Sequence, residues 1–257
     1  MHFVFPPMAH PLDSIREKLK RAEENIKNLN REIDIFLDYG IYRSIPDDDV
    51  KALSELLQLH FNRSVPLRLS VLVGEIIHQL RSTLDHLAWQ LSSDSYRISH
   101  PTRIEFPIYI HRPDPTREKD EVKRYNRKVE GFSLSVKTEI ERLQPYNSTE
   151  PRADLLAILH KMDVTEKHQE LLLVVSAFEH VVHSPMLVGD EIMFYAYADV
   201  PMSVGVEFSP NVKVRGEYSA QIAFAEFGIL QHQPVMPSLT QLLDAVRNVV
   251  VMFECEF

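Results

Sequence analysis

Cysteine, glycine and long apolar runs are all scarce in this chain. Cys255 is the only cysteine among the 257 residues, so the chain has neither an intramolecular disulfide nor a cysteine-based structural zinc site. Seven glycines and no glycine-rich loop argue against P-loop and Rossmann nucleotide binding. The longest apolar run, LLLVV at 171–175, is far below the roughly 20 residues that cross a bilayer.

The first residues also lack a signal-peptide pattern, because no basic segment precedes an apolar one. We therefore expect a cytoplasmic protein without a membrane partner. The composition, 44% hydrophobic and 25% charged, is typical of a folded globular chain.

Basic residues are outnumbered, with a net charge of −9 that argues against a nucleic-acid partner. The excess acid lies in the second half: residues 1–137 hold 21 Lys and Arg against 20 Asp and Glu, and residues 138–257 hold 7 against 17. One run, REKDEVKRYNRKVE at 117–130, is locally basic and contains Tyr125. It is either a strip that contacts phosphates or the solvated face of a helix.

Apolar spacing predicts an α+β fold. Steps of three and four residues predict long helices at 14–38, about 66–92 and 122–143, with a possible bend at Gly131, and shorter helices after 47–49, from about 151, and at 237–253. Short β-branched or aromatic segments predict strands at 171–178, 191–198, 203–208 and 218–227, with a strand-like piece at 105–110. We therefore expect an N-terminal antiparallel helical bundle over 1–168. A small antiparallel β-meander and a C-terminal helix would follow over 169–257, the two parts sharing one core or forming separate domains.

The helix at 66–92 has an unusual polar face. Glu75, His78, Arg81, Asp85 and His86 share one arc, without any lysine between 72 and 91. This face is either an ordinary wet surface or a covered cleft. Val71 and Trp89 project from the same arc, which favours partial cover.

A second segment, 160–168, repeats this spacing with the charges reversed. His160, Asp163, Lys167 and His168 match His78, Arg81, Asp85 and His86 position by position. If the two segments lie parallel, Arg81 faces Asp163 and Asp85 faces Lys167. This arrangement predicts an ionic lock inside the bundle.

Arg81 to His86, RSTLDH, fits an R-x4-H motif and resembles that of HEPN-type helical domains. The segments HQLRSTLDHLAWQL, FPI, RLQPYN and LHKMDVTEKH also resemble a widespread uncharacterised bacterial family with LRSALDH-like and DKH-like segments. The HEPN resemblance implies a bacterial, metal-independent endoribonuclease of toxin or defence type, acting on RNA at a homodimer interface, with a cognate antitoxin or other partner protein. In that role His86 transfers protons and Arg81 stabilises the phosphorane, with Asp85 and His78 completing the candidate catalytic set.

Two other classes of function compete with the ribonuclease. One is a non-catalytic interaction or structural protein in which the ionic lock only supports the fold. The other is a metal-binding bundle using Glu75, His78, His160 and His168, since Glu75-x-x-His78 matches the spacing of carboxylate-bridged helical metal sites. No cofactor is expected for the ribonuclease.

Overall fold

A computed structural model describes residues 10–37, 65–169, 171–180, 186–188, 191–193, 200–202, 217–225 and 228–257. The chain divides into two compact units. The helical unit comprises Met1–Lys27, Leu72–Glu170 and Leu239–Phe257, and the sheet unit comprises Asn28–Val71 and Leu171–Ser238. Residues 239–257 therefore group with the helices, whereas a boundary at 168 and 169 would have placed them with the strands.

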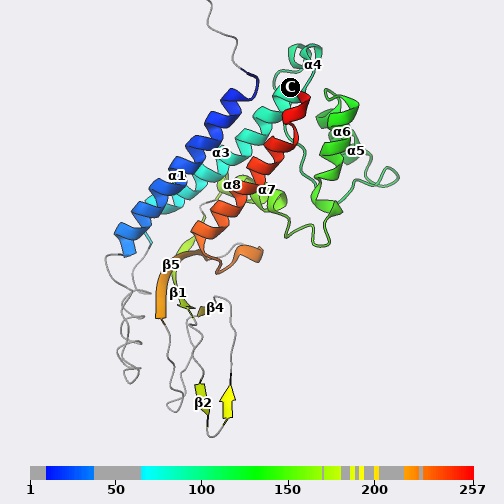
Figure 1. Cartoon of the computed structure of the whole chain (residues 1–257). Coiled ribbons are helices and arrows are strands. Elements are labelled where there is room, and N and C mark those ends of the chain that lie inside the picture. Colours follow the sequence, from blue (N-terminus) through cyan, green and yellow to red (C-terminus); the bar gives the residue numbers. More distant parts are fainter. Residues whose placement is uncertain are drawn as a thin grey trace, which may run out of the picture. The chain divides into compact units, whose positions relative to one another are not determined.

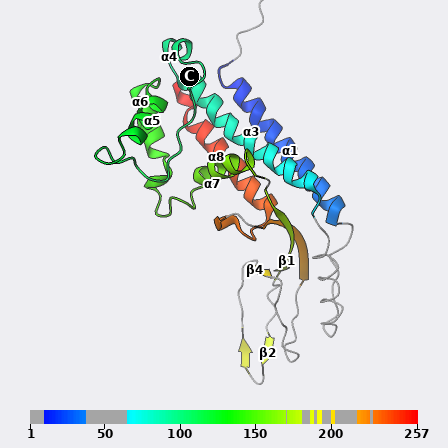
Figure 2. The ribbon, with the colours of Figure 1, turned by 180° about the vertical axis from the view of Figure 1, so that it is seen from behind.

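The helical unit contains most of three long helices, α1 (Asp13–Leu37), α3 (Leu67–Leu91) and α8 (Val235–Met252), which lie side by side (Figures 1 and 2). Hydrogen bonds from Lys18 Nζ to Ser82 Oγ (2.8 Å) and from Asn25 Nδ2 to Gln79 Oε1 (2.9 Å) join α1 to α3. Because the partner number falls as the α1 number rises, the two helices are antiparallel. The predicted apolar seam of α1 is buried, with Ile15, Ala22 and Leu29 fully covered.

The predicted helix 122–143 is two helices, α5 (Lys119–Val129) and α6 (Leu134–Arg142), separated at Gly131. A Cβ at Gly131 would stand 2.5 Å from Cδ1 of Tyr96, in the short helix α4 (Asp94–Ser99). The ring of Tyr96 therefore occupies the space that any other side chain at position 131 would need. The 3₁₀ turn η1 (Pro145–Asn147) ends this part of the chain.

Residues 105–110 do not form a strand, contrary to the prediction. Side chains replace the missing strand partner: Asp85 Oδ1 accepts from the Phe106 amide (2.8 Å) and Gln144 Oε1 accepts from the Tyr109 amide (3.1 Å). The backbone of this extended apolar segment is thus held by side chains of α3 and of the residue before η1, and not by a sheet.

Helix α7 (Leu155–Glu166) begins later than the predicted residue 151. Its N-cap is Asp154, whose carboxylate accepts from the amides of Leu156 and Ala157. The helix continues through Val164 and Thr165, so Asp163 lies on a complete turn.

The sheet unit contains antiparallel strands, as predicted. They are β1 (Leu173–His180), β2 (Met186–Val188), β3 (Glu191–Met193), β4 (Val200–Met202) and β5 (Glu217–Phe224), followed by the 3₁₀ turn η2 (Gly228–Leu230). β2 pairs with β3, as in a meander, whereas the other sheet has the order β4-β1-β5, with Leu173 opposite Phe224. The predicted strand 203–208 and the predicted helix after 47–49 lie outside the described residues.

The last turn, η3 (Glu254–Glu256), follows α8 in the helical unit. Arg16 Nη2 and Glu254 Oε1 are 3.1 Å apart, and Arg247 Nη2 and Glu23 Oε2 are 3.2 Å apart, so α8 is antiparallel to α1. Of the helices that the structure describes, none has the length and apolarity needed to span a membrane.

Candidate functional site

Arg81 is buried in the helical unit and its guanidinium is occupied by the protein itself. Only 4% of the residue is exposed. Its Nη1 donates to Asp85 Oδ1 (2.6 Å) and its Nη2 donates to the carbonyl oxygen of Phe106 (2.9 Å). Asp85 in turn accepts from the Phe106 amide, so the two side chains hold both polar groups of one residue. We call Arg81, Asp85 and the Phe106 backbone the Arg81 clamp.

His86 lies on a different side of α3 from the Arg81 clamp. Burial lowers the pKa of His86, and the nearby ammonium of Lys18, in α1, lowers it further. Five residues of separation turn a regular helix by about 140°. The structure therefore directs Arg81 towards the Phe106 segment and His86 towards α1, and does not join them around one point.

His78 and Asp163 form the link between α3 and α7. His78 Nδ1 and Asp163 Oδ1 are 2.9 Å apart, and Lys167 Nζ is 2.6 Å from Asp163 Oδ2. Asp163 is 2% exposed, whereas the side chain of His78 is 58% exposed. A hydrogen bond between His78 and Asp163 thus joins the 78–86 and 160–168 segments.

The predicted partners Arg81–Asp163 and Asp85–Lys167 are wrong, because α3 and α7 are antiparallel. A Cβ at Gly74 would meet Glu166 Cγ at 2.6 Å, so position 166 lies opposite position 74. Position 163 lies opposite 78, and Arg81 is close enough to His160 to lower its pKa. The two segments have equal spacings but run in opposite directions, so residues at matching positions do not face each other.

His160 is a half-buried imidazole close to charged side chains. Burial is the largest cause that lowers the pKa of His160 to about 4, followed by the positive charges of Arg81 and Lys128, against smaller opposing effects of Asp163 and Glu105. The buried Nδ1 of His160 has no hydrogen-bond partner among the residues that the structure describes. Because its pKa lies near 4, this histidine is uncharged at neutral pH.

The four predicted metal ligands do not come together. Among the residues that the structure describes, no group of three or more His, Cys, Asp or Glu side chains is arranged to hold a metal ion. His78 pairs with Asp163, Glu75 is exposed, and His168 follows the end of α7. His160 faces Arg81 and Lys128, whose charges oppose a cation.

A separate polar cluster, centred on Glu141, consists of residues that the sequence patterns did not single out as site residues. Glu141 Oε2 accepts from the hydroxyl groups of Tyr125 (2.5 Å) and Tyr146 (2.7 Å), and Glu141 Oε1 lies 2.6 Å from Arg112 Nη2. Burial opposes ionisation of Glu141, but these partners outweigh burial and lower its pKa. Phe106, Gln144 and Tyr146 lie in the FPI and RLQPYN segments, which were quoted above for the family resemblance. These segments were the sequence signal that could have pointed to the contacts of Phe106, Gln144 and Tyr146.

Comparisons with models of protein families, with curated proteins and with solved structures find no match to this chain.

Proposed function

We propose that this chain acts by binding a partner and not by catalysis, and that the polar contacts of α3 support its fold. The observation that carries this proposal is the burial of Arg81 with donors directed to Asp85 and Phe106. An arginine that stabilises a phosphorane presents its donors to the substrate. Freeing those donors for a substrate would break the Arg81 clamp. Asp85 and the Phe106 carbonyl would then lose Arg81 as their hydrogen-bond donor.

The position of His86 supports the same proposal. General acid-base catalysis requires the imidazole and the electrophilic group to act on one phosphate, within about 3 Å of the atoms concerned. His86 lies beside Lys18 on the side of α1, and Arg81 lies beside Phe106. The protein thus keeps its two HEPN-like residues in separate environments.

The ribonuclease role of Arg81 and His86 stays a prediction from the resemblance, and one experiment separates it from the binding role. The full-length chain is incubated with single-stranded RNA in EDTA, as wild type and as His86→Ala, Arg81→Ala and His111→Ala variants. His111 is the control because its side chain is 64% exposed and lies outside α3. Thermal unfolding of each variant is recorded in the same buffer.

We expect no cleavage that depends on His86, and a loss of stability for Arg81→Ala. RNA cleavage that survives purification and disappears in His86→Ala at unchanged melting temperature, but persists in His111→Ala, would contradict the proposal. That result would establish the ribonuclease.

A partner protein and a homodimer remain expectations of the resemblance. Sedimentation of the purified chain over a range of concentrations tests the dimer. If the wild type forms a dimer and Arg81→Ala does not, the Arg81 clamp has a role at the interface in addition to its role in the fold.

A further inference from the structure

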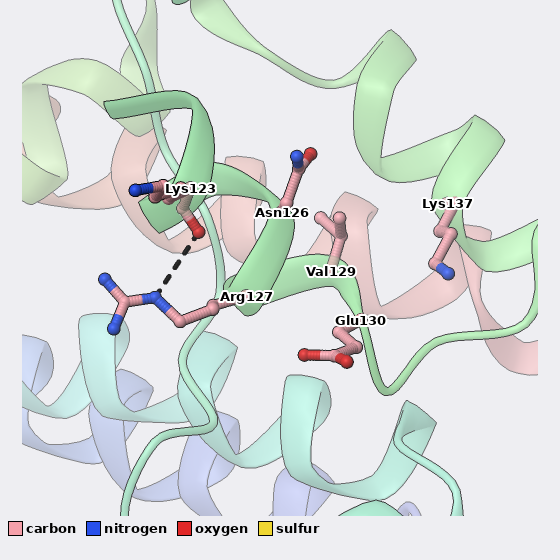
Figure 3. A pocket seen from close by; sticks show the side chains of 6 residues that line it. All are labelled: Lys123, Asn126, Arg127, Val129, Glu130 and Lys137. Carbon is pink, nitrogen blue, oxygen red and sulfur yellow. Dashed lines mark hydrogen bonds between the residues drawn. The ribbon is translucent and has the colours of Figure 1, made fainter. Parts of the chain in front are cut away.

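A basic pocket of about 700 Å³ lies at α5 and α6, outside the contacts of the Arg81 clamp. Its lining residues are Lys123, Asn126, Arg127, Val129, Glu130 and Lys137. Figure 3 shows the first five on or directly after α5 and Lys137 on the neighbouring helix. Three cations and one carboxylate give this pocket a positive charge in a chain whose net charge is −9.

The cations of the pocket are weakly neutralised. Within the ranges that the structure describes, Arg127 and Lys137 have no ion pair with a carboxylate, and Lys123 is 3.9 Å from Asp120. Arg127 donates through Nε to the Lys123 carbonyl at 3.3 Å, which leaves its two terminal nitrogens for another acceptor. By contrast, Lys128 of the same helix is occupied by Glu105 at 2.8 Å.

The cations are spread along the pocket and do not converge on one point. In Figure 3, Lys123 and Arg127 lie on one side of Val129, and Lys137 lies on the other. A single phosphate would engage one of these groups at a time. A chain of phosphates would engage them in succession, which favours an extended polyanion.

An aromatic pair lies beside the C-terminal end of α5, which carries Arg127. The rings of Tyr96 and His100 stack with centroids 4.6 Å apart, and the Tyr96 hydroxyl donates to the Arg127 carbonyl at 2.7 Å. Arg103, three residues after His100, also has no carboxylate partner in the described part of the chain. Stacked rings beside a row of cations are the combination that binds unpaired bases and their backbone.

We propose that the α5–α6 pocket binds the phosphodiester backbone of a single-stranded nucleic acid, with Lys123, Arg127 and Lys137 on successive phosphates and His100 stacking on a base. This proposal rests on the binding role proposed above and names the class of partner. Glu130 weakens the binding, because its carboxylate lies among the phosphates.

The test measures the affinity of the full-length chain for a short fluorescent oligouridylate and for the matching single-stranded DNA. The variants are Lys123→Glu/Arg127→Glu, His100→Ala and Glu130→Gln. Lys161→Glu is the control, since Lys161 is an exposed cation of α7 without an ion pair among the described residues. Circular dichroism confirms that each variant is folded.

We expect the double variant to lose at least about tenfold in affinity, His100→Ala to lose about fivefold or more, and Glu130→Gln to gain, with Lys161→Glu unchanged. Three neutralised phosphates predict a slope of about −2 for the logarithm of affinity against the logarithm of salt concentration. For the double variant, we expect the magnitude of this slope to fall below about 1.

Absence of binding would overturn the proposal, and so would either of two further results. One is equal loss of affinity in Lys161→Glu and the double variant, which would mean nonspecific attraction. The other is equal or tighter binding of a polyglutamate peptide, which would make the pocket a site for an acidic protein. Because cleavage is scored separately on gels, binding without cleavage upholds both proposals, cleavage overturns only the binding role, and absence of both overturns only the nucleic-acid site.

Discussion

Replacement of Arg81 by Ala is the most direct test of the Arg81 clamp. The change removes two hydrogen bonds from a charged donor, one to Asp85 and one to the Phe106 carbonyl, at a residue that is 4% exposed. Hydrogen bonds to charged groups contribute about 1.5 to 3 kcal/mol each to stability. The Asp85 side chain is 37% exposed, so water compensates part of its loss. We therefore expect the free energy of unfolding to fall by about 3 kcal/mol.

Thermal and urea unfolding, followed by circular dichroism, measure this loss. For a chain of this length, 3 kcal/mol corresponds to a fall of about 6 to 12 °C in melting temperature. Hydrogen exchange supplies a local readout, because the Phe106 amide donates to Asp85 and should exchange faster in the variant. Arg81→Lys should be intermediate, since an ammonium lacks the planar fork that reaches two acceptors.

Arg21→Ala is the matched control. Arg21 pairs with Glu24 at 3.2 Å in the same bundle, but its side chain is 62% exposed, so its removal should cost at most about 1 kcal/mol. If Arg81→Ala is no more destabilising than Arg21→Ala, the Arg81 clamp does not support the fold, and the argument against a catalytic Arg81 fails with it.

Three further predictions concern other contacts of the helical unit. His160 has a pKa lowered from 6.5 to about 4, so its contribution to stability is complete above the unfolded pKa of 6.5 and is lost as the pH falls towards 4. The free energy of unfolding, measured with urea, should fall over this pH range by about 1 to 2 kcal/mol less in His160→Gln than in wild type, after a discount for partial exposure. Equal falls in the two proteins would refute this prediction. Asp163→Asn should cost about 2 to 3 kcal/mol because it weakens two contacts of a buried carboxylate, and a double-mutant cycle with His78→Ala should give coupling of about 1 kcal/mol, whereas coupling near zero would deny the α3–α7 link. Gly131→Ala should destabilise by about 1 to 3 kcal/mol through its clash with Tyr96, and the penalty should shrink in a Tyr96→Ala background; an unchanged penalty would place the strain elsewhere.

Much of the fold was predictable because helices are local. The seam of α1 and the limits of α3 follow from apolar spacing, which the structure reproduces within one or two residues. Gly131 was a predicted weak point and marks the break between α5 and α6. The segment 105–110 was misassigned because a short run of apolar and aromatic residues indicates an extended backbone, but does not reveal which groups will pair with it.

By itself, the sequence determined which residues share a face of α3, since that depends only on helical periodicity. Arg81 and Asp85, one helical turn apart, pair within α3, but the tertiary structure alone decided which residues outside the helix each side chain meets. The matching spacings of 78–86 and 160–168 are the same whether two helices run parallel or antiparallel, and the antiparallel packing gave Asp163 to His78 in place of Arg81. The second acceptor for Arg81, the Phe106 carbonyl, is a backbone group that every residue possesses, so no pattern of side chains could have identified it.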